Sequence, residues 1–278
     1  SGVAMFEGRA VLEDAHTIRL GDRKVTARNI LVATGGWPVK PPVPGIEHAI
    51  TSNEAFHLPA LPERVVVVGG GYIAVEFAGI FNGLGAKTTL LYRGTQILRG
   101  FDDDVSAHLS AEIVKEGVAI HLKSDVTRID KRSGGSLNLT LLDGTELACD
   151  AVMYATGRKP NTGDMGLERL GVKLDESGAV IVDAFSQSSV PNIYAVGDVT
   201  DRIQLTPVAI KEGAAVAATL FGGKPTRADH KDVPSAVFSQ PSIGTVGLTE
   251  AEAREEFGAV DIYKSSFKPL KHTLSGRD

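Results

Sequence analysis

One stretch decides the fold of this chain: Val65-Val66-Val67-Val68-Gly69-Gly70-Gly71-Tyr72-Ile73-Ala74-Val75-Glu76-Phe77-Ala78-Gly79. The four valines have no helical period and are typical of a strand that is buried on both faces of a parallel sheet. Three glycines follow, and apolar residues then recur at helical spacing from Tyr72 to Leu84, before Gly85. Strand, glycine turn and helix in this order predict a dinucleotide-binding unit of the Rossmann type.

The glycine turn has a steric reason at each position. Gly69 allows the tight turn, and Gly71 lets the backbone approach a diphosphate at the N-terminus of the helix. Ala74 takes the third position of the pattern, where a small residue lets helix and strand pack closely. We therefore predict a dinucleotide site at Gly69, Gly70, Gly71 and Ala74. The alternative is a glycine-rich turn without a ligand.

The end of the next predicted strand, residues 87–92, indicates which dinucleotide binds. An NAD site has an Asp or Glu about 20 residues after the glycines, where it binds the 2′-hydroxyl of the adenosine ribose. This chain has Arg93 in that place and Arg99 a little further on. Guanidinium groups attract a 2′-phosphate, whereas a carboxylate repels it. We predict NADPH as the coenzyme, with a pair of solvated surface arginines as the alternative.

Length and composition exclude several classes of function. The 278 residues are enough for about two domains, and the net charge of -5 gives no electrostatic reason to expect nucleic acid or an anionic membrane as a partner. No apolar run reaches the roughly 18 residues that a membrane span needs, and no signal peptide is visible. The single cysteine, Cys149, suits a reducing compartment, so we expect a cytoplasmic protein. Without a second cysteine or an adjacent base, Cys149 is interpreted as a small buried hydrophobe.

A short pattern occurs twice. Ala-Thr-Gly-x-x-Pro stands at residues 33–38 and again at residues 155–160, each time after an apolar strand. Meanders of short predicted strands precede both copies, which favours two related nucleotide-binding units. Gly35, after Thr34, and Gly157 would let a cofactor approach the carboxyl ends of the strands, where open α/β sheets bind ligands.

Further elements are predicted along the chain. Residues 3–6 and 180–182 have the composition of strands, and residues 192–196 form a buried strand that ends in Gly197-Asp198. An Asp in this place usually forms a turn or caps a helix, and it can also accept hydrogen bonds from ligand hydroxyls. A long helix is predicted over residues 208–221 and a strand over residues 233–238.

Together these motifs resemble those of the FAD-dependent pyridine nucleotide–disulfide oxidoreductases, and within that family the glutathione reductases. The resemblance covers essentially the whole chain; besides the glycine turn and the two arginines, its specific parts are residues 193–198, 205–209, 238–250 and 268–276. It implies an α/β fold of Rossmann-like, three-layer ββα nucleotide-binding domains with the start of an α+β interface domain. The implied organisation is a first FAD-domain segment (1–50), an NADPH-binding domain (51–160), a second FAD-domain segment (161–231) and the start of a dimerisation domain (232–278).

The resemblance also implies residue roles on the NADPH side. Tyr72 would be the ring that covers the nicotinamide pocket. Ile73 and Glu76 would line the same pocket, with Glu76 paired to a flavin-side lysine upstream of this chain. Gly157 would lie against the NADPH.

Four residues are implied on the FAD side. Asp198 would bind the ribityl chain of the flavin, and Thr206 would place a backbone N–H of a helix N-terminus on the flavin ring, where it stabilises negative charge. Thr34 and Gly35 would complete this site. No metal is expected.

The implied activity is hydride transfer from NADPH to FAD, followed by electron transfer through a cysteine pair to glutathione disulfide, in a homodimer. The family's FAD fingerprint, its cysteine pair and its His-Glu motif have no counterpart in this sequence. We therefore interpret the chain as an internal fragment and expect that it does not turn over by itself, because it lacks the thiolate and the general acid.

Other functions stay open. Dihydrolipoamide dehydrogenase and mercuric reductase are alternatives in the same family, although Arg93 argues against the first, which needs a carboxylate for NAD. A non-catalytic NADPH-binding module is an alternative of another class. Ala214 occupies a helix position where some glutathione reductases carry an arginine for the peptide substrate, so glutathione is not separated from a related disulfide.

Overall fold

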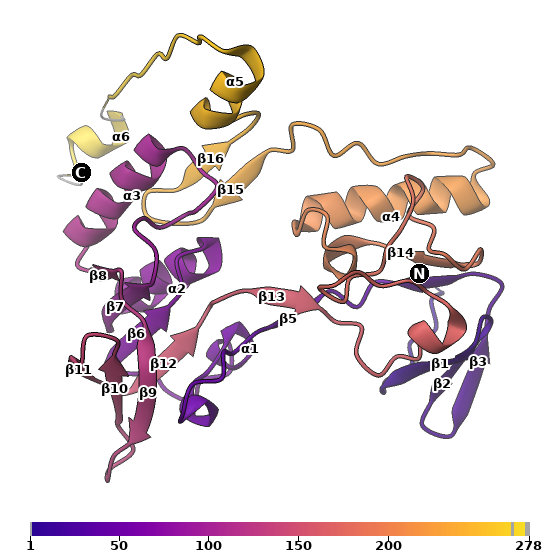
Figure 1. Cartoon of the computed structure of the whole chain (residues 1–278), viewed down its shortest axis with the longest axis horizontal. Helices are drawn as coiled ribbons and strands as arrows, with labels where there is room; N and C mark the ends of the chain where they lie inside the picture. Colours follow the sequence, from indigo (N-terminus) through magenta and orange to yellow (C-terminus); the bar gives the residue numbers. More distant parts are fainter. Residues whose placement is uncertain (1, 268–269, 276–278) are drawn as a thin grey trace.

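The structure, a computed structural model, describes residues 2–267 and 270–275. Figure 1 shows two lobes: one is built on a parallel sheet, and the other contains the N-terminal meander and the long helix α4. The strands β5 (Gly36–Pro38) and β13 (Arg158–Pro160) run between them. The predicted α/β class is confirmed.

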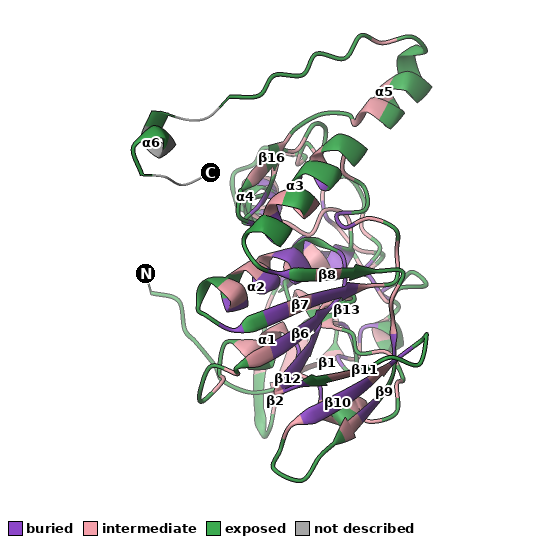
Figure 2. Ribbon diagram, turned by 90° about the vertical axis from the view of Figure 1, so that its left-hand side faces the viewer, coloured by how far each residue is buried: buried purple, intermediate pink, exposed green. Residues whose placement is uncertain are grey.

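The first lobe is organised around the valine strand. β6 (Arg64–Val68) lies between β12 (Ala151–Tyr154) and β7 (Lys87–Tyr92), and β8 (Ala119–Leu122) extends the sheet, so the order is β12-β6-β7-β8 with all strands parallel. Figure 2 shows β6 and β7 as buried strands within this lobe.

Both faces of the sheet are covered, which confirms the interpretation of the valine run. Val65 and Val67 pack among residues of the helices α2 (Tyr72–Gly83) and α3 (Asp103–Lys115). Val66 and Val68 pack on the other side against the antiparallel meander β9 (Val126–Lys131), β10 (Leu137–Leu141) and β11 (Glu146–Cys149). Burying one such side chain contributes about 1.5–3 kcal/mol, so four in succession hold the three layers together.

The second lobe repeats part of this plan. The meander β1 (Ala10–Asp14), β2 (Thr17–Leu20) and β3 (Arg23–Thr26) precedes β4 (Ile30–Val32), which pairs in parallel with β14 (Ile193–Ala195). The 3-10 helix η3 (Gly197–Thr200) follows β14, and α4 (Thr206–Phe221) follows η3. Short helical turns occur at η1 (Ile46–His48), α1 (Ser52–Ala55) and η2 (Glu168–Leu170).

The two copies of the repeated pattern pair with each other. β5 and β13 form an antiparallel ladder in which Pro38 faces Arg158 and Gly36 faces Pro160. The flanking hydrogen bonds are reciprocal: Thr34 Oγ1 donates to the carbonyl of Asn161 at 2.8 Å, and Thr156 Oγ1 donates to the carbonyl of Val39 at 3.0 Å.

The C-terminal segment docks on the helices of the sheet lobe. It contains the hairpin β15 (Ser235–Val237) and β16 (Ile243–Thr245), then α5 (Glu250–Phe257) and α6 (Leu270–Thr273). The Glu250 N–H donates to Asp102 at the start of α3, at 2.7 Å. Within the described residues, no helix is long and apolar enough to span a bilayer.

Two strand predictions are wrong. Residues 3–6 form no strand, and Val3 and Met5 are exposed, because no neighbouring strand pairs with them. Residues 180–182 form only an isolated bridge between Val180 and Leu174, since the Val180 N–H donates to Val199 instead of to a strand. The resemblance at residues 268–276 lies in part outside the described residues.

Candidate nucleotide-binding site

The three glycines of the turn meet different surroundings. Gly69 has φ 145°, and a Cβ there would stand 2.4 Å from the carbonyl oxygen of Ala155. A Cβ on Gly70 would stand 2.5 Å from the ring of Tyr92, whereas a Cβ on Gly71 would meet nothing within 4 Å. The first two glycines are therefore required by the packing of the turn itself, and the third faces open space.

The helix after the turn leaves its first N–H groups available. Gly71 is the N-cap of α2 and has no side chain to accept a hydrogen bond from the first turn. Such a helix start favours an anion, because unpaired N–H groups and the helix dipole both point at it. Ala74 is fully buried below, at the contact between helix and sheet.

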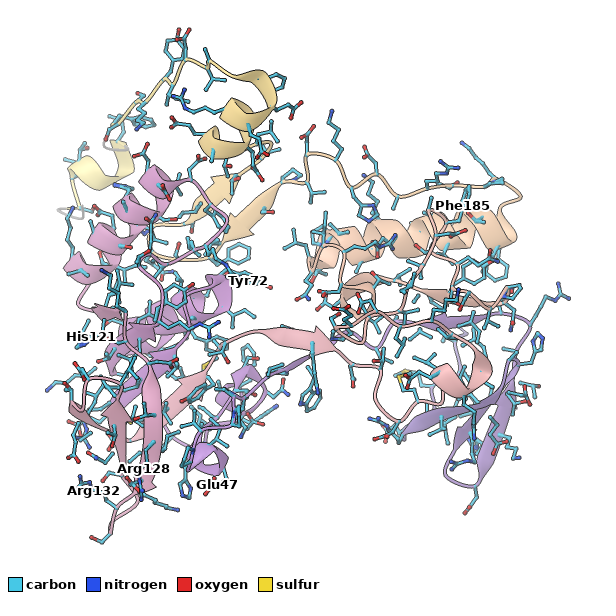
Figure 3. All side chains as sticks on the ribbon, viewed as in Figure 1. Glu47, Tyr72, His121, Arg128, Arg132 and Phe185 are labelled. Atoms are coloured by element: carbon cyan, nitrogen blue, oxygen red, sulfur yellow. The ribbon has the colours of Figure 1, made fainter. Side chains whose placement is uncertain are left out.

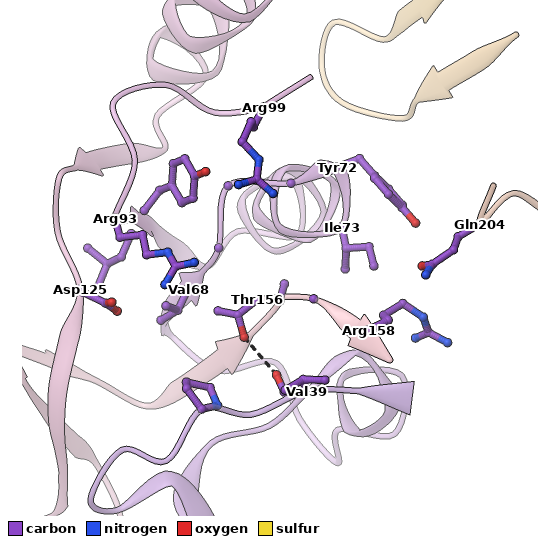
Figure 4. Close-up of a pocket in the computed structure, with 18 residues that line it drawn as sticks. Val39, Val68, Tyr72, Ile73, Arg93, Arg99, Asp125, Thr156, Arg158 and Gln204 are labelled. Atoms are coloured by element: carbon purple, nitrogen blue, oxygen red, sulfur yellow. Dashed lines mark hydrogen bonds between the residues drawn. The ribbon is translucent and has the colours of Figure 1, made fainter. Parts of the chain in front are cut away.

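A cavity of about 430 Å³ opens at this turn (Figure 4). Its volume lies in the range of small-molecule sites. It brings together eight of the ten residues predicted on the NADPH side: Gly69, Gly70, Gly71, Tyr72, Ile73, Arg93, Arg99 and Gly157. Ala74 lies beneath the wall, and Glu76 is not part of it.

One end of the cavity is cationic. Arg93 follows β7 and Arg99 lies in the loop beyond it; both are exposed, and both guanidinium groups border the cavity in Figure 4. Across the described part of the chain, no carboxylate lies within ion-pair distance of either arginine. Asp125 borders the same end beside Arg93 (Figure 4). The arginine pair is therefore available to an external anion, with one carboxylate close by.

The opposite end faces the second lobe. Tyr72, the first residue of α2, points toward the lobe that carries α4 (Figure 3). Burial raises the pKa of its hydroxyl, and the carboxylate of Asp198 raises it further. Arg158 and Gln204 complete this end of the cavity (Figure 4).

Glu76 has a partner in this chain. Its Oε1 accepts a hydrogen bond of 2.9 Å from the backbone N–H of Phe238, so it ties α2 to the C-terminal segment. The expected pairing with an upstream lysine concerns a residue outside this sequence and stays a prediction.

The four residues predicted on the FAD side lie in the second lobe. Thr34 and Gly35 follow β4, and Asp198 follows the parallel strand β14, so all three stand at the carboxyl ends of paired strands. Gly35 has φ 68° and nothing within 4 Å of a Cβ built on it, which leaves an open cradle. Thr206 begins α4, whose N-cap Leu205 offers no side-chain hydrogen bond. These residues fit a nucleotide cofactor on the same grounds as the glycine turn.

Arg158 stands between the two sites. It borders the cavity, and its Nε lies 4.0 Å from Asp198 Oδ2, while NH2 donates to the carbonyl of Gly36. Arg158 was not predicted as a site residue, and neither were Tyr92, Asp125 and Gln204 on the cavity wall. Only the position of Arg158 within the repeated pattern gave a signal.

Cys149 takes no part in either site. Its side chain is fully buried, and burial raises the pKa of its thiol to about 12. The interpretation of this residue as a buried hydrophobe is confirmed. In the described ranges, no cluster of three or more His, Cys, Asp or Glu side chains is placed to hold a metal ion.

The chain is similar in sequence to known proteins. A family profile described as pyridine nucleotide-disulphide oxidoreductase matches residues 1–213, and a profile for the dimerisation domain of that family matches residues 233–278. The chain is 51% identical over 278 residues to a glutathione reductase of Burkholderia cepacia and 48% identical over 287 aligned positions to a trypanothione reductase of Trypanosoma congolense. These alignments cover 100% and 99% of this chain, but 62% and 58% of the relatives.

A solved structure is also similar. The HOCl-induced flavoprotein disulfide reductase RclA from Escherichia coli superimposes with a TM-score of 0.85 at 32% identity, over 90% of this chain and 58% of that one. The chain thus spans a little over half the length of the proteins that it matches.

Proposed function

Because the chain belongs to the pyridine nucleotide-disulphide oxidoreductase family, we propose that it carries the NADPH site and part of the FAD site of a glutathione-disulfide reductase. Members of this family use a pyridine nucleotide and a flavin. The single observation that carries the choice of NADPH is the pair of arginines at the proposed adenosine end of the cavity, which have no ion-pair partner among the residues that the structure describes. A carboxylate in that place would favour NAD instead.

On the NADPH side, the roles follow from the wall of the cavity. Gly69, Gly70 and Gly71 shape the turn, and the free N–H groups of α2 bind the diphosphate. Arg93 and Arg99 bind the 2′-phosphate by charge-assisted hydrogen bonds. The ring of Tyr72 covers the nicotinamide end and excludes water from it.

A bound FAD would supply a hydride acceptor for NADPH and an electron donor for a disulfide. Thr34, Gly35, Asp198 and Thr206 are the residues of this chain that we propose to hold it. The positive end of the α4 dipole lies at Thr206, and it favours negative charge on a reduced ring. Arg158, between the two sites, supports Asp198 through its positive charge.

The proposed domain organisation is the one that the resemblance implies: residues 1–50 and 161–231 for the FAD side, 51–160 for the NADPH side and 232–278 for the interface. The match of residues 233–278 to a dimerisation domain supports a homodimer. We expect that this chain alone does not reduce glutathione disulfide, because its one cysteine is buried and protonated.

The coenzyme is tested by binding. We expect the chain to bind NADPH at least tenfold more tightly than NADH, because each charge-assisted hydrogen bond to the 2′-phosphate contributes about 1.5–3 kcal/mol. Arg93→Ala and Arg99→Ala should each weaken NADPH binding by roughly tenfold and leave NADH binding within twofold. Titration calorimetry measures the affinities of the chain and of each variant for NADPH and NADH, with the surface variant Arg254→Ala as control. Equal affinities for the two coenzymes would refute the proposal.

The disulfide substrate is tested separately. The similarity to both a glutathione reductase and a trypanothione reductase supports a disulfide reductase, and Ala214 is exposed on α4. Steady-state assays of the protein that contains this chain, with glutathione disulfide and with the substrate of the trypanosomal relative, distinguish the two. We expect the larger kcat/KM for glutathione disulfide.

A further inference from the structure

A carboxylate is buried in the middle of α4. Glu212 is 1% exposed and lies on the inner face of the helix with Val208, Ala215 and Val216. A buried charge loses its hydration, so it needs partners of good geometry. None of the roles proposed above uses this residue.

Both oxygens of Glu212 have partners. Oε2 accepts the backbone N–H of Gly197 at 2.7 Å. Oε1 lies 2.9 Å from NH2 of Arg202 and 2.7 Å from Nε2 of His230. Three segments meet at one carboxylate: the turn after β14, the loop before α4 and the connection to the C-terminal segment.

The contact with Gly197 fixes the start of η3. Gly197 has φ 73°, and a Cβ there would stand 3.1 Å from the Cβ of Ala209 on α4, so the turn lies close against the helix. The Thr200 hydroxyl donates to the carbonyl of Gly197 at 2.8 Å, which closes the turn from its other side. Asp198 is the next residue along the chain, and its direction depends on this turn.

Arg202 extends the same network. Its Nε donates to Thr200 Oγ1 at 3.3 Å, and its NH2 donates to Ser186 Oγ at 3.1 Å. The guanidinium group therefore holds the far end of η3 on the same carboxylate that holds the near end.

A buried ion pair contributes little stability relative to apolar residues of similar volume, but it selects one arrangement when all its hydrogen bonds are made. Here the arrangement selected is the position of the Gly197–Asp198 turn relative to the N-terminus of α4. Asp198 and Thr206 are the two residues that these elements carry into the proposed flavin site.

We propose that Glu212 is the positioning residue of the Gly197–Asp198 turn, and that it thereby sets the geometry of Asp198 relative to Thr206 for binding the flavin nucleotide. The flavin part of this statement rests on the proposed function. The positioning of the turn does not, since it depends only on residues of this chain.

Three variants of the 278-residue chain test the proposal. Glu212→Ala removes both acceptors, and Glu212→Gln keeps an acceptor for the Gly197 N–H but removes the charge. Lys211→Gln is the matched control: Lys211 is the preceding residue on α4 and contacts the same connection, through the carbonyl of Asp229 at 2.9 Å, but not the turn.

The first readout is amide hydrogen exchange without ligand. Residues 197–200 should exchange at least tenfold faster in Glu212→Ala than in Lys211→Gln, with Glu212→Gln in between. Exchange rates within threefold of the control in both Glu212 variants would overturn the proposal.

The second readout is coenzyme affinity. FAD binding, followed by flavin fluorescence, should weaken at least tenfold in Glu212→Ala and less in Glu212→Gln, while NADPH binding stays within twofold in all variants. An unchanged FAD affinity in Glu212→Ala, or an equal loss of NADPH affinity, would overturn the positioning role. Failure of the unmodified chain to bind FAD would count against the flavin part of the proposed function alone. The hydrogen-exchange readout needs no ligand and decides the positioning of the turn by itself.

Discussion

At the scale of single residues, the adenosine end of the cavity contains one charge that opposes the proposed ligand. Asp125 borders the cavity beside Arg93 (Figure 4). A 2′-phosphate carries about −1.5 to −2 charges at neutral pH, so a carboxylate nearby repels it. Arg93 partly screens this repulsion.

We therefore expect Asp125→Asn to increase NADPH affinity by roughly three- to tenfold at low salt, because one opposing charge is removed. NADH lacks the 2′-phosphate, and its affinity should change less than twofold. Calorimetric titration at two ionic strengths measures the effect, which should shrink as salt is added. A fall in NADPH affinity would show instead that Asp125 orients Arg93.

Cys149 gives a second test at this scale. Burial raises the pKa of its thiol to about 12, against about 8.5 for a free cysteine. At pH 8 the native chain should not react with iodoacetamide within an hour, and the denatured chain should incorporate one label.

The same shift makes the free energy of unfolding depend on pH. Between about pH 8.5 and the folded pKa of about 12, the unfolded thiol loses its proton while the folded thiol keeps it. The unfolded state then binds fewer protons, so this group's contribution falls as pH rises, by at most about 1.4 kcal/mol per pH unit. The free energy of unfolding of the chain and of Cys149→Ala, measured by denaturant titration at pH 8 and at pH 10, gives the contribution of the thiol as the difference between the two proteins. If the difference in unfolding free energy between the two proteins were the same at pH 8 and pH 10, the raised pKa of the Cys149 thiol would be contradicted.

At the scale of elements, different glycines of one turn serve the fold and the proposed binding of coenzyme. Gly69 has a positive φ and a carbonyl oxygen next to the position of a Cβ, whereas Gly71 has φ -83° and open space there. A side chain is therefore excluded at Gly69 by the fold itself, whereas at Gly71 the fold leaves room for one.

Gly71→Ala should leave the melting temperature within a few degrees of the parent, because the change at the N-cap costs only about 0.5 kcal/mol. It should weaken NADPH binding at least tenfold, since the new methyl group occupies the space of the diphosphate. Gly69→Ala should instead destabilise the fold by more than about 1 kcal/mol. Thermal unfolding and coenzyme titration of both variants test this pair. An equal loss of stability in Gly69→Ala and Gly71→Ala would contradict the assignment of Gly69 to the fold and of Gly71 to coenzyme binding.

At the scale of the whole molecule, two strands that share one sequence pattern pair between the two lobes, and the connection from α4 to β15 crosses between them as well. The pairing of β5 with β13 is flanked by two equivalent hydroxyl-to-carbonyl hydrogen bonds, from Thr34 and from Thr156. The Val39 N–H also donates to Gly157 at 3.0 Å, and the Asn161 N–H donates to Gly35 at 2.9 Å. These contacts tie the segment after β4 to the segment after β12, and so connect the two proposed nucleotide sites.

The double variant Thr34→Val, Thr156→Val keeps the shape of both side chains and removes both hydroxyl donors. We expect amide exchange at residues 36–39 and 158–161 to increase by about fivefold, because local opening of the ladder becomes easier. Thr127→Val is the control, since Thr127 donates a similar bond of 3.0 Å to the carbonyl of Thr140 within the meander. Exchange no faster than in the control would show that the two hydroxyl groups do not stabilise the ladder.

The sequence alone predicted the central unit of the fold. The valine run, the glycines and the helical spacing after them act over neighbouring residues, through backbone sterics and local hydrogen bonding. For the same reason Arg93, directly after the next strand, and Arg99, in the loop beyond it, could be placed near the turn. Residues 180–182 have the apolar composition of a strand but form only an isolated bridge, because strand formation also needs a partner strand, which local composition does not specify.

Only the tertiary structure decided which distant segments meet. Asp125, Arg158 and Gln204 reach the wall of the cavity from three separate segments. No pattern marks Asp125 or Gln204, and Arg158 is marked only by its place in the repeated pattern. In the sequence, Glu212 is one of two adjacent charges on an otherwise apolar helix, and its contacts with Gly197, Arg202 and His230 depend on how that helix packs. Local patterns determine the backbone of each element, whereas contacts between elements depend on the packing of the whole chain.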